Sequence, residues 1–234
     1  MRPANEDSYL CHPPVWAVAD GLGGHPAGDV ASALALEPLR ELAERAASAA
    51  TGSAAEDGDP AAALADAVRE GNRRVHADAM ASTERFGMGT TLTAAYIAGD
   101  RVHVAHVGDS RCYHWRRGDG LRQVTVDHTP AGEALAAGQL SAEQAAIHPE
   151  RHVLARAVGL DPEVRVDASS AFALAPGDVA LLCSDGLTEV VGDDAIADVL
   201  ERSPDAASAV DELIGQALAG GGPDNVTVVV VRRS

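Results

Sequence analysis

The stretch TTLTAAYIAGDRVHVAHVGDSRCYHWR, residues 90–116, decides the fold class of this 234-residue chain. It contains three runs of residues that favour β-strands, and Gly-Asp pairs at 99–100 and 108–109 separate the runs. Gly-Asp pairs between such runs are typical of the tight connections that join neighbouring strands. The sequence therefore predicts three strands in succession, at Thr90–Ile97, Arg101–Val107 and Arg111–Arg116.

Two long segments with helical spacing precede these strands. Ala27–Ala50 and Ala61–Ala81 carry apolar residues at the intervals that amphipathic helices show. Pro38 lies inside the first segment, where we expect a kink or a break. The polar stretch TGSAAEDGDP, at Thr51–Pro60, is predicted to connect the two helices, and a short strand is predicted before them at Val15–Ala19.

The second half of the chain mixes short strands and helices. Thr129–His152 is polar and rich in Ala, with two short helical patterns, and we interpret it as an inserted flap. The further elements predicted are strands at Glu163–Leu174, Asp178–Ser184 and Val226–Val231, and helices at Asp193–Arg202 and Asp205–Ala219. Because long helices lie between groups of hairpin-linked strands, the chain lacks the regular alternation of a parallel sheet. We therefore predict a single α+β domain over residues 1–234, an antiparallel sheet sandwich covered by helices.

Composition and charge exclude several classes of protein. Apolar residues make up 46% of the chain, and Phe and Tyr are scarce, so the core must rest on many small, closely packed contacts. The formal net charge is −17 and no basic run exceeds two residues, which argues against binding to nucleic acid or to an anionic membrane. The chain has no lysine, which excludes Schiff-base chemistry, pyridoxal attachment and the phosphate-binding Lys of a Walker loop.

Cysteine use and hydropathy indicate the cell compartment. Cys11, Cys112 and Cys183 show no C-x-x-C spacing and lie in or beside apolar stretches. We interpret them as small buried residues, with a redox role as the alternative. No apolar run approaches the roughly 18–20 residues of a membrane span, and no signal-peptide core opens the chain. We therefore expect a reducing, cytoplasmic setting.

Acidic residues gather at the ends of the apolar runs. Asp20 follows VWAVA, Asp109 follows VHVAHVG, Asp185 follows VALLCS, Asp224 precedes NVTVVVV, and Glu6 and Asp7 lie beside SYL. One acid at a strand end is ordinary turn chemistry. If the sheets bring these ends together, however, several carboxylates share a small, partly buried space. Like charges at that range cannot all stay ionised unless cations neutralise them, so the pattern favours a cation site.

The ligand types at these positions point to hard cations. Carboxylates with no Cys or His among them select Mg²⁺ or Mn²⁺ rather than Zn²⁺ or Cu²⁺. The histidines do not offer a better site, because His103 and His106 are three apart on a strand and point to opposite faces. His148 and His152 have the spacing of a zinc-binding helix, but in HPERH a proline stands where the catalytic Glu would be. A zinc site is therefore disfavoured.

Seven segments, spread in order over nearly the whole chain, resemble those of the metal-dependent PPM-type (PP2C-like) protein serine/threonine phosphatases in their compact bacterial form. They are RPANED at Arg2–Asp7, VADGLGGH at Val18–His25, GTTLTAAYI at Gly89–Ile97, HVGDSR at His106–Arg111, HPERHVLARAVG at His148–Gly159, CSDGLTE at Cys183–Glu189 and GPDNVTVVVV at Gly222–Val231. The resemblance implies a central β-sandwich of two antiparallel sheets flanked by helices, in agreement with the fold predicted above.

The resemblance also implies a site that holds two Mn²⁺ or Mg²⁺ ions. Asp20 would bridge the ions, Glu6 and the carbonyl of Gly21 would bind one of them, and Asp185 and Asp224 would bind the other. Two cations about 3.5–4 Å apart lower the pKa of a bridging water, so a hydroxide would be available to attack the phosphorus of phosphoserine or phosphothreonine. Such a mechanism needs no phosphoenzyme and therefore no Cys or Ser nucleophile.

Other positions take supporting roles by the same resemblance. Arg2 matches the arginine that binds the substrate phosphate, and Asp7 and Asn225 would orient ligands and waters. Asp109 and Glu189 match positions that hold a weaker third ion in similar proteins. The implied partners are phosphoprotein substrates and a serine/threonine protein kinase, with no nucleic acid and no membrane.

The chain departs from the family pattern in three places. Leu22 stands where many relatives outside bacteria carry a His that protonates the leaving alkoxide, so His25 or a metal-bound water is expected to serve instead. Glu189 replaces a more usual Asp, which changes the geometry expected for a third ion. A strand normally precedes the R-x-x-N-E-D segment, but Met1 stands directly before Arg2, so we expect a mis-assigned start or a truncated enzyme.

Two other functions stay open on the sequence. The first is a non-catalytic regulatory module of the same fold, although such a module has no reason to keep acidic ligands crowded together. The second is a phosphoesterase that acts on small molecules. It shares its metal and phosphate chemistry with a protein phosphatase, and only the family resemblance separates the two.

Overall fold

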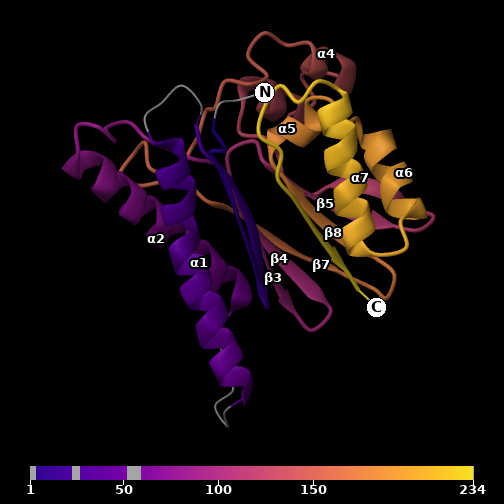
Figure 1. Ribbon diagram of the computed structural model, residues 1–234, viewed down its shortest axis with the longest axis horizontal. Helices are drawn as coiled ribbons and strands as arrows, with labels where there is room; N and C mark the ends of the chain where they lie inside the picture. The colour runs from indigo at the N-terminus through magenta and orange to yellow at the C-terminus, as the bar shows by residue number, and fades with distance from the viewer. Residues whose placement is uncertain (1–3, 23–26, 52–58, 234) are drawn as a thin grey trace.

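The computed structural model describes residues 4–22, 27–51 and 59–233. Within these ranges, nine strands form two antiparallel sheets (Figure 1). The first sheet, in the order β1-β2-β3-β4-β7, consists of β1 (Asp7–His12), β2 (Val15–Asp20), β3 (Leu92–Ala98), β4 (Arg101–Val107) and β7 (Asp167–Ala173). The second, in the order β6-β5-β8-β9, consists of β5 (Arg111–Arg116), β6 (Gly120–Gln123), β8 (Val179–Cys183) and β9 (Val228–Arg232). The helices are α1 (Gly28–Thr51), α2 (Pro60–Ala81), α3 (Pro130–Ala136), α4 (Ala142–Ala146), α5 (Asp185–Thr188), α6 (Asp193–Arg202) and α7 (Ala206–Ala219).

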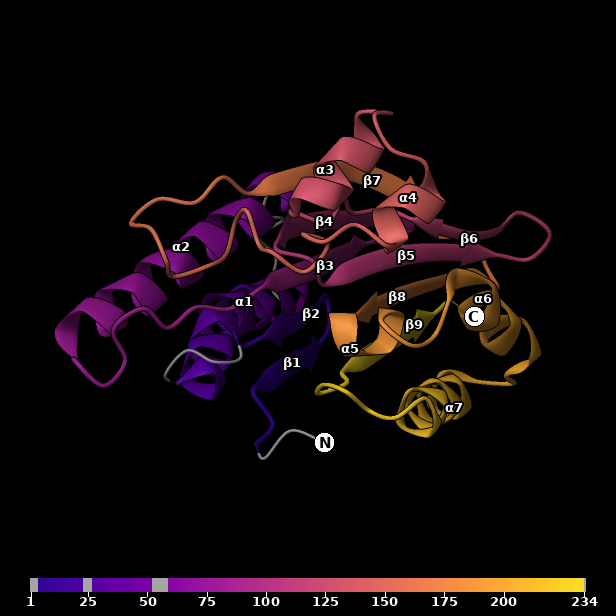
Figure 2. The same ribbon diagram turned by 90° about the horizontal axis from the view of Figure 1, so that it is seen from above.

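The elements stack in four layers, helix on sheet on sheet on helix (Figure 2). Helices α1 and α2 pack on the first sheet, helices α5, α6 and α7 pack on the second, and a third apolar cluster fills the space between the sheets. That cluster includes Val18, Ala95 and Leu182, all fully buried. Because many core side chains are Ala or Val, the layers can approach closely. None of the helices in the described ranges has the length and apolar character that a membrane crossing requires.

The chain crosses from the first sheet to the second through residues 108–110, which link β4 to β5. Gly108 has a φ of 112°, and a Cβ there would lie 2.6 Å from the Cβ of Thr91, so only glycine fits. Asp109 follows in the same link. The crossing therefore delivers a carboxylate to the end of the sandwich where β2 and β8 also finish.

The predicted α+β sandwich is confirmed, as are most of its elements. Arg101–Val107, Arg111–Arg116 and Asp193–Arg202 match β4, β5 and α6 at both ends. The predicted flap, Thr129–His152, does contain two short helices, α3 and α4. The predicted connection at Thr51–Pro60 lies almost entirely outside the described residues.

The structure differs from the sequence prediction in two elements. Pro38 does not break the first helix, since α1 runs through it from Gly28 to Thr51, and a kink there stays a prediction. The loss of one N–H is outweighed by the packing of α1 against α2 and the first sheet. The strand predicted at Glu163–Leu174 begins only at Asp167. The strands β1 and β6 and the helix α5 were not predicted, since β6 and α5 have four residues each and are too short to show a period.

Close packing of α1 against α2 depends on Gly71, and this can be tested. A Cβ at Gly71 would lie 2.7 Å from the backbone oxygen of Ala35, so the two helices would have to separate. We expect Gly71→Ala to lower the free energy of unfolding by about 1–3 kcal/mol. Gly215, in α7, is the matched control, because a Cβ there meets nothing within 4 Å. Gly215→Ala should raise the free energy of unfolding by about 0.5–1 kcal/mol. Urea denaturation measures both, and effects of the same sign would contradict this account.

Candidate metal centre

Four aspartates from different elements meet at one end of the sandwich. Asp7 and Asp20 are paired opposite each other across β1 and β2. Asp109 lies in the link between the sheets, and Asp185 begins α5 directly after β8. The charges of Asp7, Asp109 and Asp185 all act on Asp20. The fold thus brings these four carboxylates together, which is the condition on which the sequence argument for a cation site depended.

Asp20 is held by its backbone while its carboxylate faces other acids. Its N–H donates to the hydroxyl oxygen of Thr91 over 3.1 Å, and its carbonyl accepts from the Thr91 N–H and from the Thr90 hydroxyl, each at 2.8 Å. Burial, followed by the charges of its acidic neighbours, raises the pKa of Asp20 well above its usual value. The local hydrogen bonds thus fix the position of a carboxylate that the site itself destabilises in its charged form.

The pKa values of Asp109 and Asp185 are raised for the same reasons. Burial and then the charge of Asp185 raise the pKa of Asp109 to about 8. Burial and then the charge of Glu189 raise the pKa of Asp185 to about 6. A hydrogen bond between the carboxyl groups of Asp20 and Asp185 raises the pKa of Asp20 further and lowers that of Asp185. Without cations, this group of acids holds protons that isolated carboxyls would have released.

Buried oxygens without partners test whether a cation fits here. One carboxylate oxygen of Asp7 accepts from the hydroxyls of Ser184 at 2.9 Å and Thr227 at 2.7 Å. Its other oxygen, and the Oδ1 of Asp185, are buried and have no hydrogen-bond partner in the described part of the chain. An orphaned buried oxygen calls for a ligand. Since the donors are carboxylates, the residues fit a hard divalent cation.

Glu6 and Gly21 lie together beside this cluster. The Gly21 N–H donates to the backbone oxygen of Glu6 over 3.2 Å. A Cβ at Gly21 would lie 2.3 Å from the oxygen of Gly28, so a side chain at position 21 would push the start of α1 away. A Cβ at Gly28 would in turn lie 3.0 Å from the Oε1 of Glu6. Both glycines are thus needed where three segments of backbone converge on one carboxylate.

Asn225 ties the N-terminal segment to the last loop of the chain. Its Oδ1 accepts from the N–H of Glu6 at 3.0 Å, and its Nδ2 donates to the carbonyl of Ala4 at 3.1 Å. Asp224 lies next to it and accepts the Asn225 N–H with its own carboxylate at 2.8 Å. The charge of Asp224 raises the pKa of both Asp7 and Asp185. Asp224 therefore belongs to the same electrostatic cluster.

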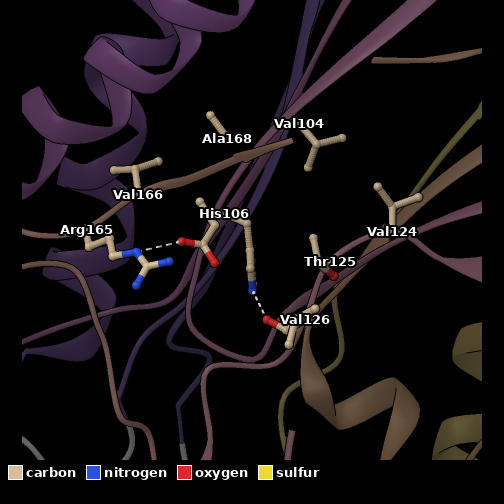
Figure 3. Close-up of a pocket in the computed structure, with 9 residues that line it drawn as sticks. Val104, His106, Val124, Thr125, Val126, Arg165, Val166 and Ala168 are labelled. Carbon is tan, nitrogen blue, oxygen red and sulfur yellow. Dashed lines mark hydrogen bonds and ion pairs between the residues drawn. The ribbon is translucent and has the colours of Figure 1, made fainter. Parts of the chain in front are cut away.

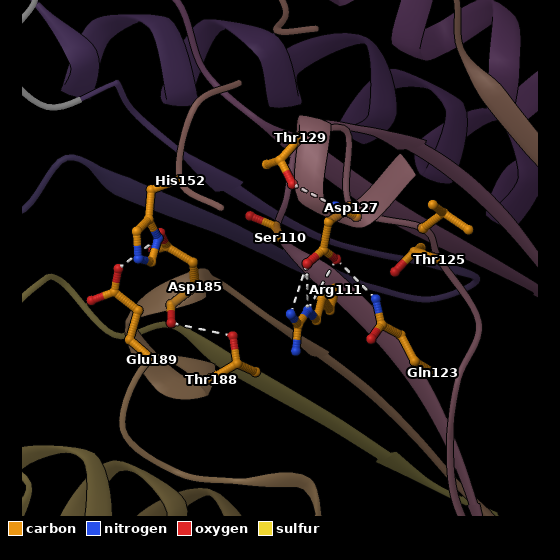
Figure 4. Close-up of polar contacts among 12 residues, drawn as sticks. Ser110, Arg111, Gln123, Thr125, Asp127, Thr129, His152, Asp185, Thr188 and Glu189 are labelled. Atoms are coloured by element: carbon orange, nitrogen blue, oxygen red, sulfur yellow. Dashed lines mark hydrogen bonds and ion pairs between the residues drawn. The ribbon is translucent and has the colours of Figure 1, made fainter. Parts of the chain in front are cut away.

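A histidine that the sequence reasoning set aside also lies at this site. The Nδ1 of His152 is 3.2 Å from the Oε1 of Glu189 (Figure 4). One ligand atom from each of His152, Asp185 and Glu189 can be chosen so that all lie within 4.8 Å of one another. In the sequence, His152 was considered as a ligand only together with His148, on a zinc-binding helix, but residues 149–152 form turns. The one feature of the sequence that could have pointed to His152 was its place in the HPERH motif, within residues 129–152.

A cavity of about 470 Å³ opens beside the carboxylates. The segment 129–152 forms one wall of it, through Arg151, His152 and small residues of α3 and α4. On another wall the guanidinium of Arg111 donates to the carboxylate of Asp127 at distances down to 2.7 Å (Figure 4). The cavity therefore combines acidic groups at its base with arginine side chains at its walls, which suits an anionic substrate held next to cations.

Two predicted functional residues cannot be placed. Arg2 and His25 lie outside the described residues. Leu22 is described, and its N–H donates to the carbonyl of Gly89 over 3.0 Å. The roles suggested for Arg2 and His25 stay predictions.

Comparisons with known proteins identify the family. A family model described as "Protein phosphatase 2C" matches residues 5–134, and one described as "Stage II sporulation protein E (SpoIIE)" matches residues 139–234. The chain is 42% identical to the serine/threonine protein phosphatase PstP of Mycobacterium tuberculosis, over 98% of this chain and 42% of that protein. It is 38% identical to the serine/threonine phosphatase stp of Listeria welshimeri, over 94% of this chain and 85% of that protein.

A solved structure agrees with the fold. The catalytic domain of PstP, in complex with two manganese ions, aligns with 98% of this chain and 92% of its own at 40% identity and a TM-score of 0.81. These similarities show that the chain belongs to the PPM-type protein phosphatase 2C family of bacteria. It spans less than half of the length of PstP, 42%, and most of the length of stp, 85%.

The raised pKa values predict how the stability of the metal-free protein depends on pH. The folded state binds the Asp109 proton more tightly than the unfolded state does, with a pKa of about 8 against an ordinary value of 3.8. This contribution to stability is fully present below pH 3.8 and is lost as the pH rises through about 8. In the presence of EDTA, we expect the temperature of the thermal midpoint to decrease as the pH is raised from about 5 to about 8.

The matched control is Asp109→Asn, which cannot ionise. Its thermal midpoint should fall less steeply over the same pH range. Parallel pH profiles of the two proteins, measured by differential scanning calorimetry, would show that Asp109 is not the group that titrates.

Proposed function

We propose that this chain is a metal-dependent protein serine/threonine phosphatase that hydrolyses phosphoserine and phosphothreonine residues. The observation that carries the proposal is the cluster of Asp7, Asp20, Asp109 and Asp185, each with a raised pKa. Such a cluster carries its full charge only when cations neutralise it. Membership of the protein phosphatase 2C family, and the two manganese ions of the PstP complex, support Mn²⁺ or Mg²⁺ as those cations.

Five residues are proposed to hold two ions. Asp20 would bind both, Glu6 and the carbonyl of Gly21 would complete one site, and Asp185 and Asp224 would complete the other. The orphaned oxygen of Asp185 and the convergence of backbone at Gly21 support these assignments. When bound, two such ions would supply a hydroxide nucleophile near neutral pH and neutralise charge on the phosphoryl oxygens.

The remaining residues are proposed to orient these ligands and the substrate. Asp7, held by two hydroxyl groups, would accept hydrogen bonds from ordered water with its free oxygen. Asn225 would keep Glu6 in place through the backbone. Arg2 would bind the substrate phosphate. Phosphoproteins are the proposed substrates, and a serine/threonine protein kinase that phosphorylates them is the proposed functional partner.

A third, weaker ion is proposed between Asp109 and Glu189. The nearness of His152 to Glu189 and Asp185 adds a nitrogen ligand to that region. Mn²⁺ accepts imidazole more readily than Mg²⁺ does, so the third position should favour Mn²⁺.

The direct test is phosphate release from a phosphothreonine peptide. We expect turnover with Mn²⁺ and none after exhaustive chelation with EDTA, with recovery when Mn²⁺ is restored. Full turnover without metal would exclude the proposed mechanism. Hydrolysis of small phosphate esters without hydrolysis of the peptide would favour a small-molecule phosphoesterase, and no hydrolysis of either would favour a non-catalytic module.

Cation binding should also stabilise the fold. At Mn²⁺ concentrations about 100 times the dissociation constant, one site adds about 2.7 kcal/mol to the free energy of unfolding. For a chain of this size we expect the thermal midpoint to rise by about 5–10 °C. An unchanged midpoint at saturating Mn²⁺ would count against a structured site. The control is Asp20→Asn, measured with and without Mn²⁺ in Ca²⁺-free buffer.

Loss of single ligands should separate catalysis from folding. Loss of a residue that only supports a metal ligand typically lowers activity by about 10–100-fold. Asp20→Asn and Asp185→Asn should each lower kcat by more than that. Because each change removes one repelling charge, the metal-free variants should be at least as stable as the wild type. Near-normal turnover at moderate Mn²⁺ would show that the ligand assignment is wrong, and a large drop in metal-free stability would show a structural role.

A further inference from the structure

The link that carries Asp109 is fastened to a histidine outside the cluster. The backbone N–H of Gly108 donates to the ring Nδ1 of His128 over 3.0 Å. The backbone N–H of His128 donates in return to the carbonyl of Gly108 over 2.8 Å. These two hydrogen bonds join residues that are twenty positions apart. They fix the backbone immediately before Asp109, on the segment whose direction decides where that carboxylate points.

The protonation state of His128 follows from its partners. Because Nδ1 accepts a backbone N–H, it carries no proton, and the proton lies on Nε2. Nε2 donates to the Oδ2 of Asp167 over 3.1 Å, and Arg156 holds the other oxygen of Asp167 at 2.8 Å. The hydrogen bond from Arg156 lowers the pKa of Asp167 to about 2, so Asp167 stays an acceptor. His128 is completely buried, and both ring nitrogens are used.

The segment 124–129, which contains His128, lies beside two cavities. Val124 and Val126 line a surface cavity of about 440 Å³ on one side, while Asp127 and Thr129 line the cavity of the metal centre on the other. The segment 124–129 therefore contributes residues to the linings of both cavities. His106 supports it from the first cavity, where its Nε2 donates to the Val126 carbonyl over 3.1 Å (Figure 3).

The rings of His106 and His128 lie against each other, with centroids 4.5 Å apart. Asp127, the residue before His128, accepts a hydrogen bond from Arg111, and both side chains line the metal-centre cavity. The segment thus connects the backbone of Gly108 to both cavities through polar contacts. Both ring nitrogens of the buried His128 are paired, as buried polar groups require, and one of the two partners is the backbone that leads into Asp109.

We propose that His128 is a positioning residue, whose Nδ1 holds the backbone of Gly108 and thereby directs the Asp109 carboxylate toward the cations. This inference rests on the proposed function, because it takes Asp109 as a cation ligand. Asp167 and Arg156 act through His128 by fixing its tautomer. None of the three needs to touch the substrate.

Two substitutions separate the nitrogens of His128. His128→Asn places an amide oxygen near the position of Nδ1, so it can still accept the Gly108 N–H, but it cannot reach Asp167. His128→Gln places an amide nitrogen near the position of Nε2, so it can still donate to Asp167, but it leaves Gly108 without an acceptor. If His128 acts by positioning, Asn should rescue function and Gln should not.

The measurement is an isothermal calorimetric titration of the protein with Mn²⁺, without substrate. Asp109→Asn defines which part of the isotherm depends on Asp109. We expect His128→Gln to weaken that part by about 10–100-fold, as losses of outer metal-site partners do, while His128→Asn stays near the wild type. Hydrogen exchange of the Gly108 amide in the metal-free protein should be faster in His128→Gln than in His128→Asn. Thermal midpoints of both variants show whether a general loss of stability is the cause.

Each result decides the matter. Mn²⁺ binding that His128→Gln leaves intact, or that both variants weaken equally, overturns the positioning role. An Asp109→Asn isotherm identical to that of the wild type shows instead that Asp109 is not a ligand, and both the assignment and the inference then fail. If His128→Gln does not fold, NMR of the ring nitrogens in the wild-type protein still tests the inference, because a proton found on Nδ1 overturns it.

Discussion

Repulsion among carboxylates that share a partly buried space is the constraint on which the rest of this structure depends. Asp7, Asp20, Asp109 and Asp185 come from separate elements and reach one place. Within the described ranges, none of these four forms an ion pair with an arginine, and Asp7 is held by hydroxyl groups instead. The fold thus keeps anionic groups close together without neutralising them itself. That arrangement leaves the compensation to cations, and it explains why the surrounding backbone is so closely tied by hydrogen bonds.

The small core residues and the glycines also help to bring the carboxylates close together. A core of Ala and Val lets the two sheets and their covering helices approach closely. Glycine occurs where two backbones must touch, as at Gly21 against Gly28 and at Gly186, whose Cβ would lie 2.0 Å from the backbone oxygen of Asn225. These contacts carry the loop of Asp224 onto α5 and the segment of Glu6 onto α1. A larger side chain at Gly21 or Gly186 would move carboxylates that lie several residues away.

Much of this was predictable from the sequence, and what was missed has physical reasons. Acids beside glycine at strand ends are a local pattern, so Asp20, Asp109 and Asp185 were identified, although spacing alone does not say which ends meet. Short elements such as β6 and α5 carry too little periodicity to be recognised. The contacts of His152 with Glu189 and of His128 with Gly108 depend on tertiary packing and have no local signature. The helix through Pro38 shows that packing overrides propensity, as it often does.

Because the acids sit on elements from both sheets, the order of events in folding is constrained. Asp7 and Asp20 belong to the first sheet, Asp185 follows a strand of the second, and Asp109 lies on the passage between them. The four carboxylates meet only when the two sheets have docked, and the contacts of Asp185 with Asp7 and Asp20 join residues far apart in the sequence. A cation that binds only the finished arrangement leaves the folding rate unchanged and slows unfolding. The metal centre would then act as a kinetic lock on the closed sandwich.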